Sequence, residues 1–377
     1  MRPRVVGMIG GGQLARLSAP AAQRLGIELR VLDPSPDCPA ARAGLTVVRG
    51  RSDDRNAIRN LVTQCDVTTF ETEYVDTDAL IELADLGHRI TPDPRLMQQL
   101  TNKLTQKRLL RRLELPTTKF TELTSPSVAA LRNFGLPAVV KRQRGGYDGR
   151  GVLVIHDEHE VDGLWRDASL IETYLADVVE LAVLVVRAAD GETRVYPVAE
   201  MVFSSVHHAL DHLIVPAEQP SHIVRAAQAL ALRTISAIGG VGLFAVEMFV
   251  TSTSEIVINE IAPRAHNSGH YTIEACVTSQ FEQHLRAIIG DPLGAADLLR
   301  PAAMINLIGS PGCRGPTTIE GWDGQPQPDA AIHLYEKREC WPGRKMGHVT
   351  ALGSSGRAAL LAARSLAERI RVRGAAS

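Results

Sequence analysis

The chain of 377 residues predicts a globular protein of α/β and α+β class with two or three domains. It opens with an apolar strand (residues 4–9), the Gly10-Gly11-Gly12 turn, a helix-like stretch (13–25) and a second strand (28–32), which together make a β-turn-α-β unit. Later apolar runs are joined by short polar turns, a pattern that is typical of antiparallel hairpins. A hydrophobic content of 45% is enough to build a core in each domain.

Bulk composition excludes several classes of function. The net charge is −1 with basic and acidic residues interspersed, so there is no basic field to attract nucleic acid. No apolar run reaches the roughly 18 residues of a transmembrane helix, and the N-terminus lacks a secretory signal. An odd number of widely spaced cysteines argues against a disulfide framework; they are Cys38, Cys65, Cys276, Cys313 and Cys340. We therefore expect reduced thiols in a cytoplasmic protein.

The glycine turn leaves a dinucleotide-binding function open. Gly10, Gly12 and Ala15 match the dinucleotide fingerprint, and Asp33 follows the second glycine by 33 − 12 = 21 residues. Pro20 lies inside the expected helix, where it removes a backbone hydrogen bond at a cost of about 3 kcal/mol. A nicotinamide-dependent oxidoreductase is therefore an alternative that this turn alone does not favour.

A second carboxylate-bearing turn follows the apolar strand at residues 67–70. Glu71 and Glu73 emerge at the carboxyl end of that strand, the usual ligand edge of an open α/β sheet. We take Glu71 as a candidate for a polar contact to the substrate. Two breakers in Thr-Pro-Asp-Pro then close the first domain near Pro94.

Three long helices are predicted in the middle of the chain. The first covers about 95–113 and carries Lys103 and Lys107 on one face, with Lys107 expected in solvent. The second covers 221–238, with Ser221 as its N-cap. The third covers 273–289 and is closed by Pro292, and a terminal helix is expected at 357–370.

A glycine-rich loop lies between two strand-like runs, 138–142 and 152–155. Four glycines in positions 145–151 leave a loop whose bare backbone N–H groups can surround a triphosphate. Lys141 stands near the end of the first strand. The loop is not a Walker loop, because no Gly-Lys-Ser/Thr follows it.

A hairpin near residue 250 predicts a metal site. Strand-like runs at 243–250 and 255–261 flank a polar turn, so Glu247 and Glu260 are equidistant from the turn and face each other, about 4.5–5.5 Å apart between Cα atoms. Facing carboxylates repel each other unless a cation lies between them. With Asn259 adjacent, this is the oxygen ligation that Mg²⁺ prefers when it also holds substrate phosphates.

Polar and cationic residues crowd the segment after this hairpin. Arg264, His266, Asn267, Ser268 and His270 lie within seven positions, a density that a packed core could not bury unpaired. The segment therefore predicts an anionic or hydrogen-bonding ligand.

The run Asn-Glu-Ile-Ala-Pro-Arg-Ala-His-Asn-Ser-Gly-His at 259–270 resembles the metal and substrate segment of the N5-carboxyaminoimidazole ribonucleotide synthase family. This family belongs to the ATP-grasp superfamily, and the resemblance extends in matching order from Gly10 to His348. It implies an ATP-grasp fold in three parts. These are a Rossmann-like N-terminal domain (1–94), an ATP-grasp domain with a glycine-rich lid (95–300) and a small β-rich C-terminal domain (301–377).

The resemblance also implies a role for each candidate residue. The expected ATP contacts are Lys103, Lys141, Gly146, Tyr147, Asp148, Gly149, Arg150, Gly151, Glu172, Thr173, Tyr174, Leu175, Glu180, Asn259 and Glu260. The expected substrate contacts are Gln13, Leu14, Glu71, Tyr147, Asp148, Arg150, Arg264, His266, Asn267, Lys337 and Arg344. Arg264, His266 and Lys141 are the expected catalytic residues, and Glu247 and Glu260 the expected Mg²⁺ ligands.

The implied reaction is the ATP- and bicarbonate-dependent carboxylation of 5-aminoimidazole ribonucleotide through carboxyphosphate, by a homodimer. One alternative is a sister ATP-grasp ligase that formylates glycinamide ribonucleotide with formate. The nicotinamide oxidoreductase is a second. A nucleotide-responsive binding protein without turnover is a third, suggested only by Phe203, which stands where the family usually has a histidine.

Overall fold

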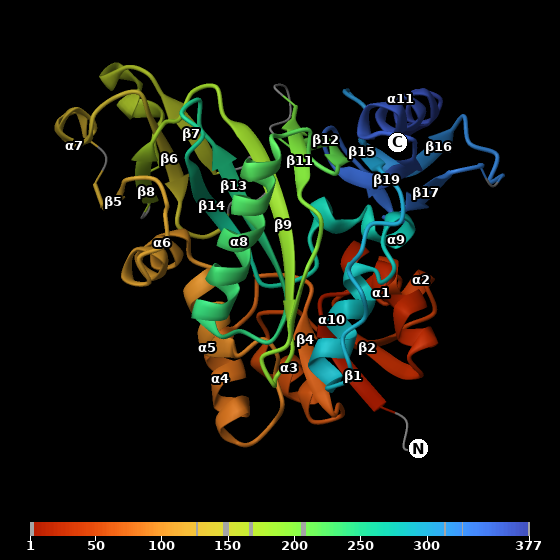
Figure 1. Ribbon diagram of the computed structural model, residues 1–377. Coiled ribbons are helices and arrows are strands. Elements are labelled where there is room, and N and C mark those ends of the chain that lie inside the picture. The colour runs from red at the N-terminus through yellow and green to blue at the C-terminus, as the bar shows by residue number, and fades with distance from the viewer. Residues whose placement is uncertain are drawn as a thin grey trace.

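The computed structural model describes residues 4–125, 127–145, 151–165, 169–204, 209–312, 314–325 and 327–375. Figure 1 shows the N-terminal sheet in red below the C-terminal region in blue, with the central sheets beside both. The described cysteines Cys38, Cys65, Cys276 and Cys340 are free thiols, as expected, and Cys313 lies outside the described residues. Among the described helices, none is long and apolar enough to cross a membrane.

The N-terminal region is a four-stranded parallel sheet in the order β3-β2-β1-β4. Its strands are β1 (Arg4–Ile9), β2 (Ile27–Asp33), β3 (Thr46–Arg49) and β4 (Val67–Phe70). Its helices are α1 (Gln13–Arg24), α2 (Pro39–Arg42), α3 (Arg55–Val62) and α4 (Thr77–Asp85). The predicted β-turn-α-β opening is confirmed, and α1 runs through Pro20 without ending.

The single helix predicted at 95–113 is wrong, because two helices occupy this stretch. They are α5 (Pro94–Leu100) and α6 (Lys103–Arg112). The side chain of Asn102 accepts hydrogen bonds from the backbone N–H groups of Leu104 and Thr105, so it caps a new helix at this point.

A small four-stranded antiparallel sheet in the order β5-β8-β6-β7 follows α6. Its elements are β5 (Phe120–Leu123), α7 (Val128–Phe134), β6 (Ala138–Arg142), β7 (Val152–Ile155), the 3₁₀ turn η1 (Glu158–Gly163) and β8 (Ser169–Thr173). The predicted pairing of the strands around the glycine-rich loop is confirmed by β6 and β7.

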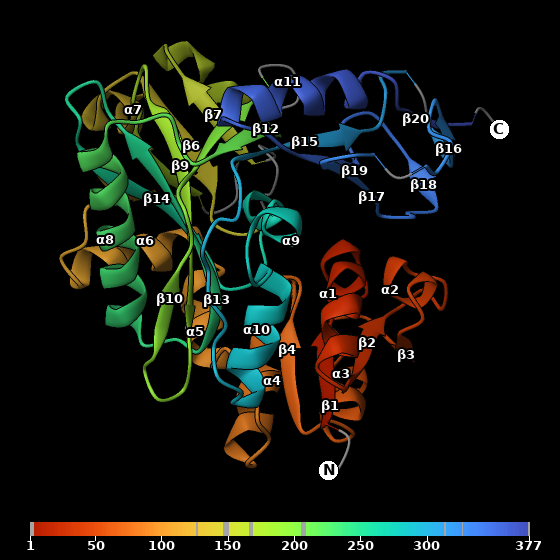
Figure 2. The same cartoon turned by 45° about the vertical axis from the view of Figure 1, so that its right-hand side comes forward.

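The largest sheet has nine strands in the order β14-β13-β9-β11-β12-β15-β19-β17, with β10 paired to β9. The first six in sequence are β9 (Val179–Arg187), β10 (Thr193–Val195), β11 (Ala199–Phe203), β12 (Leu210–Val215), β13 (Gly242–Val250) and β14 (Ile256–Ala262). The last three are β15 (Ala302–Ile308), β17 (Ala330–Leu334) and β19 (Lys345–Leu352). Because β15 pairs with β12, this sheet crosses the predicted boundary between residues 300 and 301 (Figure 2).

The remaining elements lie outside this sheet. They are α8 (Ser221–Ile238), the 3₁₀ turn η2 (Asn267–Gly269), α9 (Thr272–Ala275), α10 (Gln280–Ile289), β16 (Gly315–Glu320), β18 (Glu339–Cys340), α11 (Gly356–Ala367) and β20 (Arg371–Gly374). The strands β18, β16 and β20 form a separate three-stranded sheet.

Three predicted helix boundaries need correction. Ser221 is the first helical residue of α8 rather than its cap, and the cap position is held by Pro220. The helix predicted at 273–289 is interrupted, because Ser279 accepts a hydrogen bond from the backbone N–H of Glu282 and starts α10. The terminal helix ends at Ala367 because the chain then enters β20.

Candidate active site

A cavity of about 1310 Å³ lies between the small sheet and the β13–β14 hairpin. It brings together thirteen of the predicted site residues: Lys103, Lys141, Glu172, Thr173, Tyr174, Leu175, Glu180, Glu247, Asn259, Glu260, Arg264, His266 and Asn267. Residues 146–150, which hold five predicted contacts from Gly146 to Arg150, lie outside the described residues. The cavity is therefore built by segments that are far apart in the sequence.

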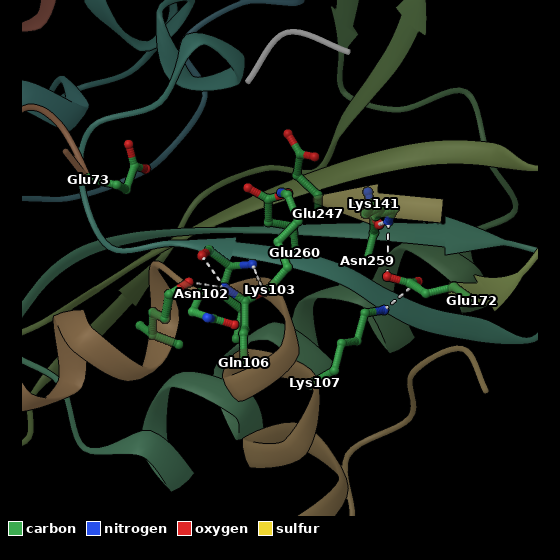
Figure 3. Close-up of polar contacts among 12 residues, drawn as sticks. Glu73, Asn102, Lys103, Gln106, Lys107, Lys141, Glu172, Glu247, Asn259 and Glu260 are labelled. Carbon is green, nitrogen blue, oxygen red and sulfur yellow. Dashed lines mark hydrogen bonds and ion pairs between the residues drawn. The ribbon is translucent and has the colours of Figure 1, made fainter. Parts of the chain in front are cut away.

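The predicted register of the metal hairpin is confirmed, since Glu247 pairs with Glu260 across β13 and β14 (Figure 3). Burial, with Glu260 and then Glu180 nearby, raises the pKa of Glu247 to about 8. Burial acts in the same direction on Glu260, but the ammonium of Lys103, which forms an ion pair with it, lowers the pKa of Glu260. One carboxylate of the pair is thus paired with a cation, and the other carries a raised pKa.

The donor set at this hairpin fits Mg²⁺. Two carboxylates and the amide oxygen of Asn259 are hard oxygen ligands, and Mg²⁺ is usually held by one or two carboxylates plus substrate phosphates. Among the described residues, no cluster of three His, Cys, Asp or Glu side chains is arranged as a complete metal cage. The hairpin is therefore suited to an ion that the substrate shares.

Lys107 is buried, so the prediction that it lies in solvent is wrong. Its ammonium lies 3.0 Å from Glu172 Oε2, and Lys141 Nζ lies 3.3 Å from Glu172 Oε1 (Figure 3). Lys141 also donates a hydrogen bond of 2.9 Å to Asn259 Oδ1. Burial would raise the pKa of Glu172, but Lys141 and Lys107 outweigh it and hold this pKa at about 2.

Glu180 and Phe203 line the wall of the cavity on β9 and β11. Burial raises the pKa of Glu180 to about 7, against the opposing effect of Lys141. Phe203 packs against the main hydrophobic core while lining the cavity, so an apolar ring occupies this part of the wall. Two histidines that follow Phe203 closely in the sequence, His207 and His208, lie outside the described residues.

The segment after the hairpin reaches the cavity through three side chains. Arg264 Nε lies 2.7 Å from Glu73 Oε1, and His266 Nε2 lies 3.5 Å from Glu247 Oε1. Asn267 exchanges a pair of amide hydrogen bonds, 2.8 and 3.0 Å, with Asn306 of β15. Sequence reasoning missed Glu73 and Asn306; Glu73 stood in the same acidic turn as Glu71, whereas nothing in the sequence signalled Asn306.

Glu71 caps α1 and does not line the cavity. Its carboxylate accepts hydrogen bonds from the backbone N–H groups of Gly12 and Ala15. A Cβ at Gly12 would lie 2.5 Å from Glu71 Oε1, and one at Gly10 would lie 2.4 Å from Glu71 Cγ. The glycines thus make room for a protein carboxylate at the helix N-terminus, where a dinucleotide would place its phosphates.

Five other predicted residues also lie outside the cavity lining. Leu14 is buried in the N-terminal core, and Gly151 accepts a backbone hydrogen bond from Arg142. Lys337 donates to Gln13 Oε1 (2.6 Å) and to the carbonyl of Lys345, while the Arg344 guanidinium lies 3.8 Å from the ring centroid of Trp341. Lys345, a cation in the same C-terminal segment as Lys337 and Arg344, does line the cavity and was not predicted as a site residue.

Known proteins match this chain along most of its length. Residues 4–100 match the ribonucleotide synthetase preATP-grasp domain, 108–281 the ATP-grasp domain, and 302–362 the phosphoribosylaminoimidazole carboxylase C-terminal domain. The N5-carboxyaminoimidazole ribonucleotide synthase of Bacillus subtilis is 38% identical over 355 residues, covering 92% of this chain and 90% of its own. That of Mycobacterium leprae is also 38% identical, covering 93% of this chain and 84% of its own.

Solved structures agree with these relatives. The N5-carboxyaminoimidazole ribonucleotide synthetase of Thermotoga maritima has a TM-score of 0.90 at 36% identity, covering 98% of this chain and 99% of its own. The Aspergillus clavatus synthase, solved in complex with ADP and 5-aminoimidazole ribonucleotide, has a TM-score of 0.86 at 33% identity, covering 97% of this chain and 99% of its own. The chain therefore belongs to the N5-carboxyaminoimidazole ribonucleotide synthase family of ATP-grasp proteins.

Proposed function

We infer that this chain is an ATP-dependent ligase that converts 5-aminoimidazole ribonucleotide to N5-carboxyaminoimidazole ribonucleotide, a C–N bond-forming step of purine biosynthesis. The observation that carries this function is the single cavity in which the facing Glu247 and Glu260 lie with Lys141, Arg264 and His266. This combination supports the proposal, because facing carboxylates suit an ion held with nucleotide phosphates and the cationic groups suit an anionic acceptor.

Bicarbonate is the proposed source of the carboxyl group. A bicarbonate oxygen attacks the γ-phosphorus of ATP, ADP leaves, and carboxyphosphate forms. The exocyclic amine of the imidazole then attacks the carboxyl carbon, or CO₂ released from it, while phosphate leaves and the amine loses a proton. No side chain becomes a covalent nucleophile.

The chain's own residues serve this sequence by positioning and by charge. Lys141 places an ammonium beside the phosphates, where negative charge develops during transfer. Arg264 and His266 hold the carboxyl intermediate and the amine in register, which removes much of the entropic barrier. Glu247 and Glu260 would hold Mg²⁺ with Asn259 beside them, and the ion would neutralise phosphate charge.

Assembly and compartment complete the proposal. We expect a homodimer in the cytoplasm; the free thiols of the described cysteines are compatible with a reducing compartment. Size-exclusion chromatography with light scattering measures the assembly directly, and a monomer at assay concentration would contradict the dimer.

Phosphate release tests the reaction. It is measured with ATP and Mg²⁺, with and without 5-aminoimidazole ribonucleotide, in bicarbonate buffer and in bicarbonate-depleted buffer. We expect acceptor-stimulated release only where bicarbonate is present. Release driven instead by formate and glycinamide ribonucleotide would identify the sister ligase, and ATP binding without stimulated release would indicate a binding protein.

A further inference from the structure

Lys107 lies behind the cavity rather than in its wall. It sits on α6 with 2% of its surface exposed, and it is absent from the cavity lining. Its ammonium lies 2.8 Å from Thr117 Oγ1, 3.0 Å from Thr118 Oγ1 and 3.0 Å from Glu172 Oε2. A lysine is almost never buried this deeply unless it is paired, so these contacts account for its burial.

The two oxygens of Glu172 are divided between two lysines. Oε2 accepts from the Thr118 hydroxyl at 2.6 Å and pairs with Lys107, whereas Oε1 lies 3.3 Å from Lys141 Nζ. Lys141 is in turn within 2.9 Å of Asn259 Oδ1, next to the metal carboxylate Glu260. Lys141 therefore stands between a buried anion on one side and the proposed nucleotide site on the other.

We propose that Lys107 is a positioning residue for nucleotide binding, which neutralises Glu172 so that the ammonium of Lys141 remains available at the cavity wall. The inference rests on the proposed function only in taking Lys141 as a phosphate contact. Among the described residues, Lys107 and Lys141 form the ion pairs of Glu172. Without Lys107, Lys141 is drawn toward Glu172, because an unpaired buried charge is strongly unfavourable. The ammonium of Lys141 then pairs with Glu172 and no longer interacts with the phosphates of ATP.

The neighbouring residues of α6 separate this role from simple packing. Lys103, one turn earlier, lines the cavity and pairs with Glu260, so it faces the ligand directly. Lys107 instead faces Glu172, the carboxylate that contacts Lys141. Arg108, the next residue, is exposed and pairs with Glu122, and neither of the two lines the cavity, which makes Arg108 a matched control for the loss of a cation.

A double-mutant cycle tests the proposal. Wild type, Lys107→Met, Glu172→Gln and the double variant are titrated with ATP in the presence of Mg²⁺ by calorimetry. We expect Lys107→Met to weaken ATP binding about tenfold in the wild-type background and far less in the Glu172→Gln background. In steady state the KM for ATP rises, while the KM for 5-aminoimidazole ribonucleotide is unchanged. Lys107→Arg, which keeps the charge, restores affinity, and Arg108→Met has no effect.

Two results would overturn the proposal: an unchanged ATP affinity in Lys107→Met, or an equal loss in both backgrounds, which would make Lys107 a packing residue only. Thermal unfolding checks that each variant is folded. Lys107→Gln, which keeps a hydrogen-bonding group beside Thr117 and Thr118, replaces the methionine variant if that variant does not fold. Because the readout is ATP affinity, a wild type that binds ATP but does not carboxylate the acceptor refutes the proposed function alone.

Discussion

At the scale of single residues, the site is governed by which buried charges have partners. Glu247 and Glu260 face each other on adjacent strands, yet only Glu260 has an ammonium beside it. This difference separates their pKa values in opposite directions, as expected when two like charges share a low-dielectric site. We propose that this pair accepts a cation shared with the substrate phosphates.

Removal of either carboxylate tests this pair. We expect Glu260→Ala to abolish phosphate release, and Glu247→Gln to lower kcat by about 10²-fold, because each removes a proposed ligand of the ion that would stabilise the transferred phosphoryl group. Glu247→Gln should fold as stably as wild type near neutral pH, since burial and Glu260 raise the pKa of Glu247 to about 8 and a neutral amide resembles its protonated form. Phosphate release and thermal unfolding measure both effects; normal activity in Glu260→Ala contradicts the metal assignment.

Lys107 gives the site a predicted pH dependence. Burial is the largest effect and lowers the pKa of Lys107 to about 8. The negative charges of Glu172 and Glu260 raise this pKa, and the positive charge of Lys141 lowers it further. Below pH 8 the ammonium neutralises Glu172, and above pH 8 it loses its proton. We therefore expect the KM for ATP to rise as the pH passes 8. Lys107→Arg should flatten this rise, because a guanidinium stays charged; an identical profile in both proteins would contradict the assignment.

At the scale of elements, α6 supports the edge of the large sheet. The strand β14 ends the sheet, and the buried side chain of Gln106 satisfies both backbone groups of Ile261 on it: Nε2 donates to the carbonyl at 3.0 Å and Oε1 accepts from the N–H at 2.8 Å. Ile258 is held in the same way by the backbone of Pro116 and the hydroxyl of Thr117. Glu260, a proposed metal ligand, lies between these two anchored positions.

We expect Gln106→Ala to lower the stability of the protein. It removes the side-chain partner of the N–H and carbonyl of Ile261 and of the carbonyl of Leu100, so we expect a loss of about 2–4 kcal/mol in the free energy of unfolding. Urea denaturation measures it, and Arg112→Ala on the exposed side of α6 is the control, with a change within about 0.5 kcal/mol. Equal stability of the two variants would show that β14 is held by other contacts.

Local patterns predicted the elements well, whereas contacts between distant elements were not predictable. Turn position and apolar runs were sufficient to place Glu247 opposite Glu260, because hairpin register depends on nearby residues alone. Lys103 and Lys107 were also placed correctly four residues apart on one helix. The burial of Lys107 was not predictable, because Thr118 and Glu172, which contact it, come from later segments of the chain. The cap at Asn102 was visible in the sequence as an Asn before a helical run and was overlooked.

At the scale of the whole molecule, the N-terminal and C-terminal regions meet at a polar seam. The guanidinium of Arg16 donates to both carboxylate oxygens of Glu336 and to the carbonyl of Leu334, and Arg338 pairs with Asp37. The predicted substrate residues Gln13 and Lys337 are hydrogen-bonded to each other within this seam. The seam thus holds two predicted acceptor contacts in place, on segments more than 300 positions apart in the sequence.

Arg16→Ala tests whether the seam aligns the acceptor. A partly exposed ion pair is worth about 1 kcal/mol, which corresponds to about fivefold in affinity, so we expect the KM for 5-aminoimidazole ribonucleotide to rise about fivefold. The KM for ATP should stay constant. Arg30→Ala, which breaks a pair with Glu28 inside the N-terminal sheet, is the control. A rise confined to the KM for ATP would place the acceptor elsewhere.

The order of the regions along the chain was predictable, but their junction was not. The composition of residues 301–377 correctly indicates many strands, yet no local signal shows that β15 adds to β12 rather than to a separate sheet. Asn306 on that strand then reaches back to Asn267 in the cavity. A strand from the last quarter of the chain therefore orients a predicted acceptor contact that is encoded earlier.

This junction has a consequence for synthesis on the ribosome. Until residues 302–308 have emerged, β12 presents a row of unpaired backbone groups along one side, and exposed strand edges of this kind promote association between nascent chains. A stop codon before codon 302 would leave this edge of β12 unpaired, so such truncated proteins should accumulate as insoluble material.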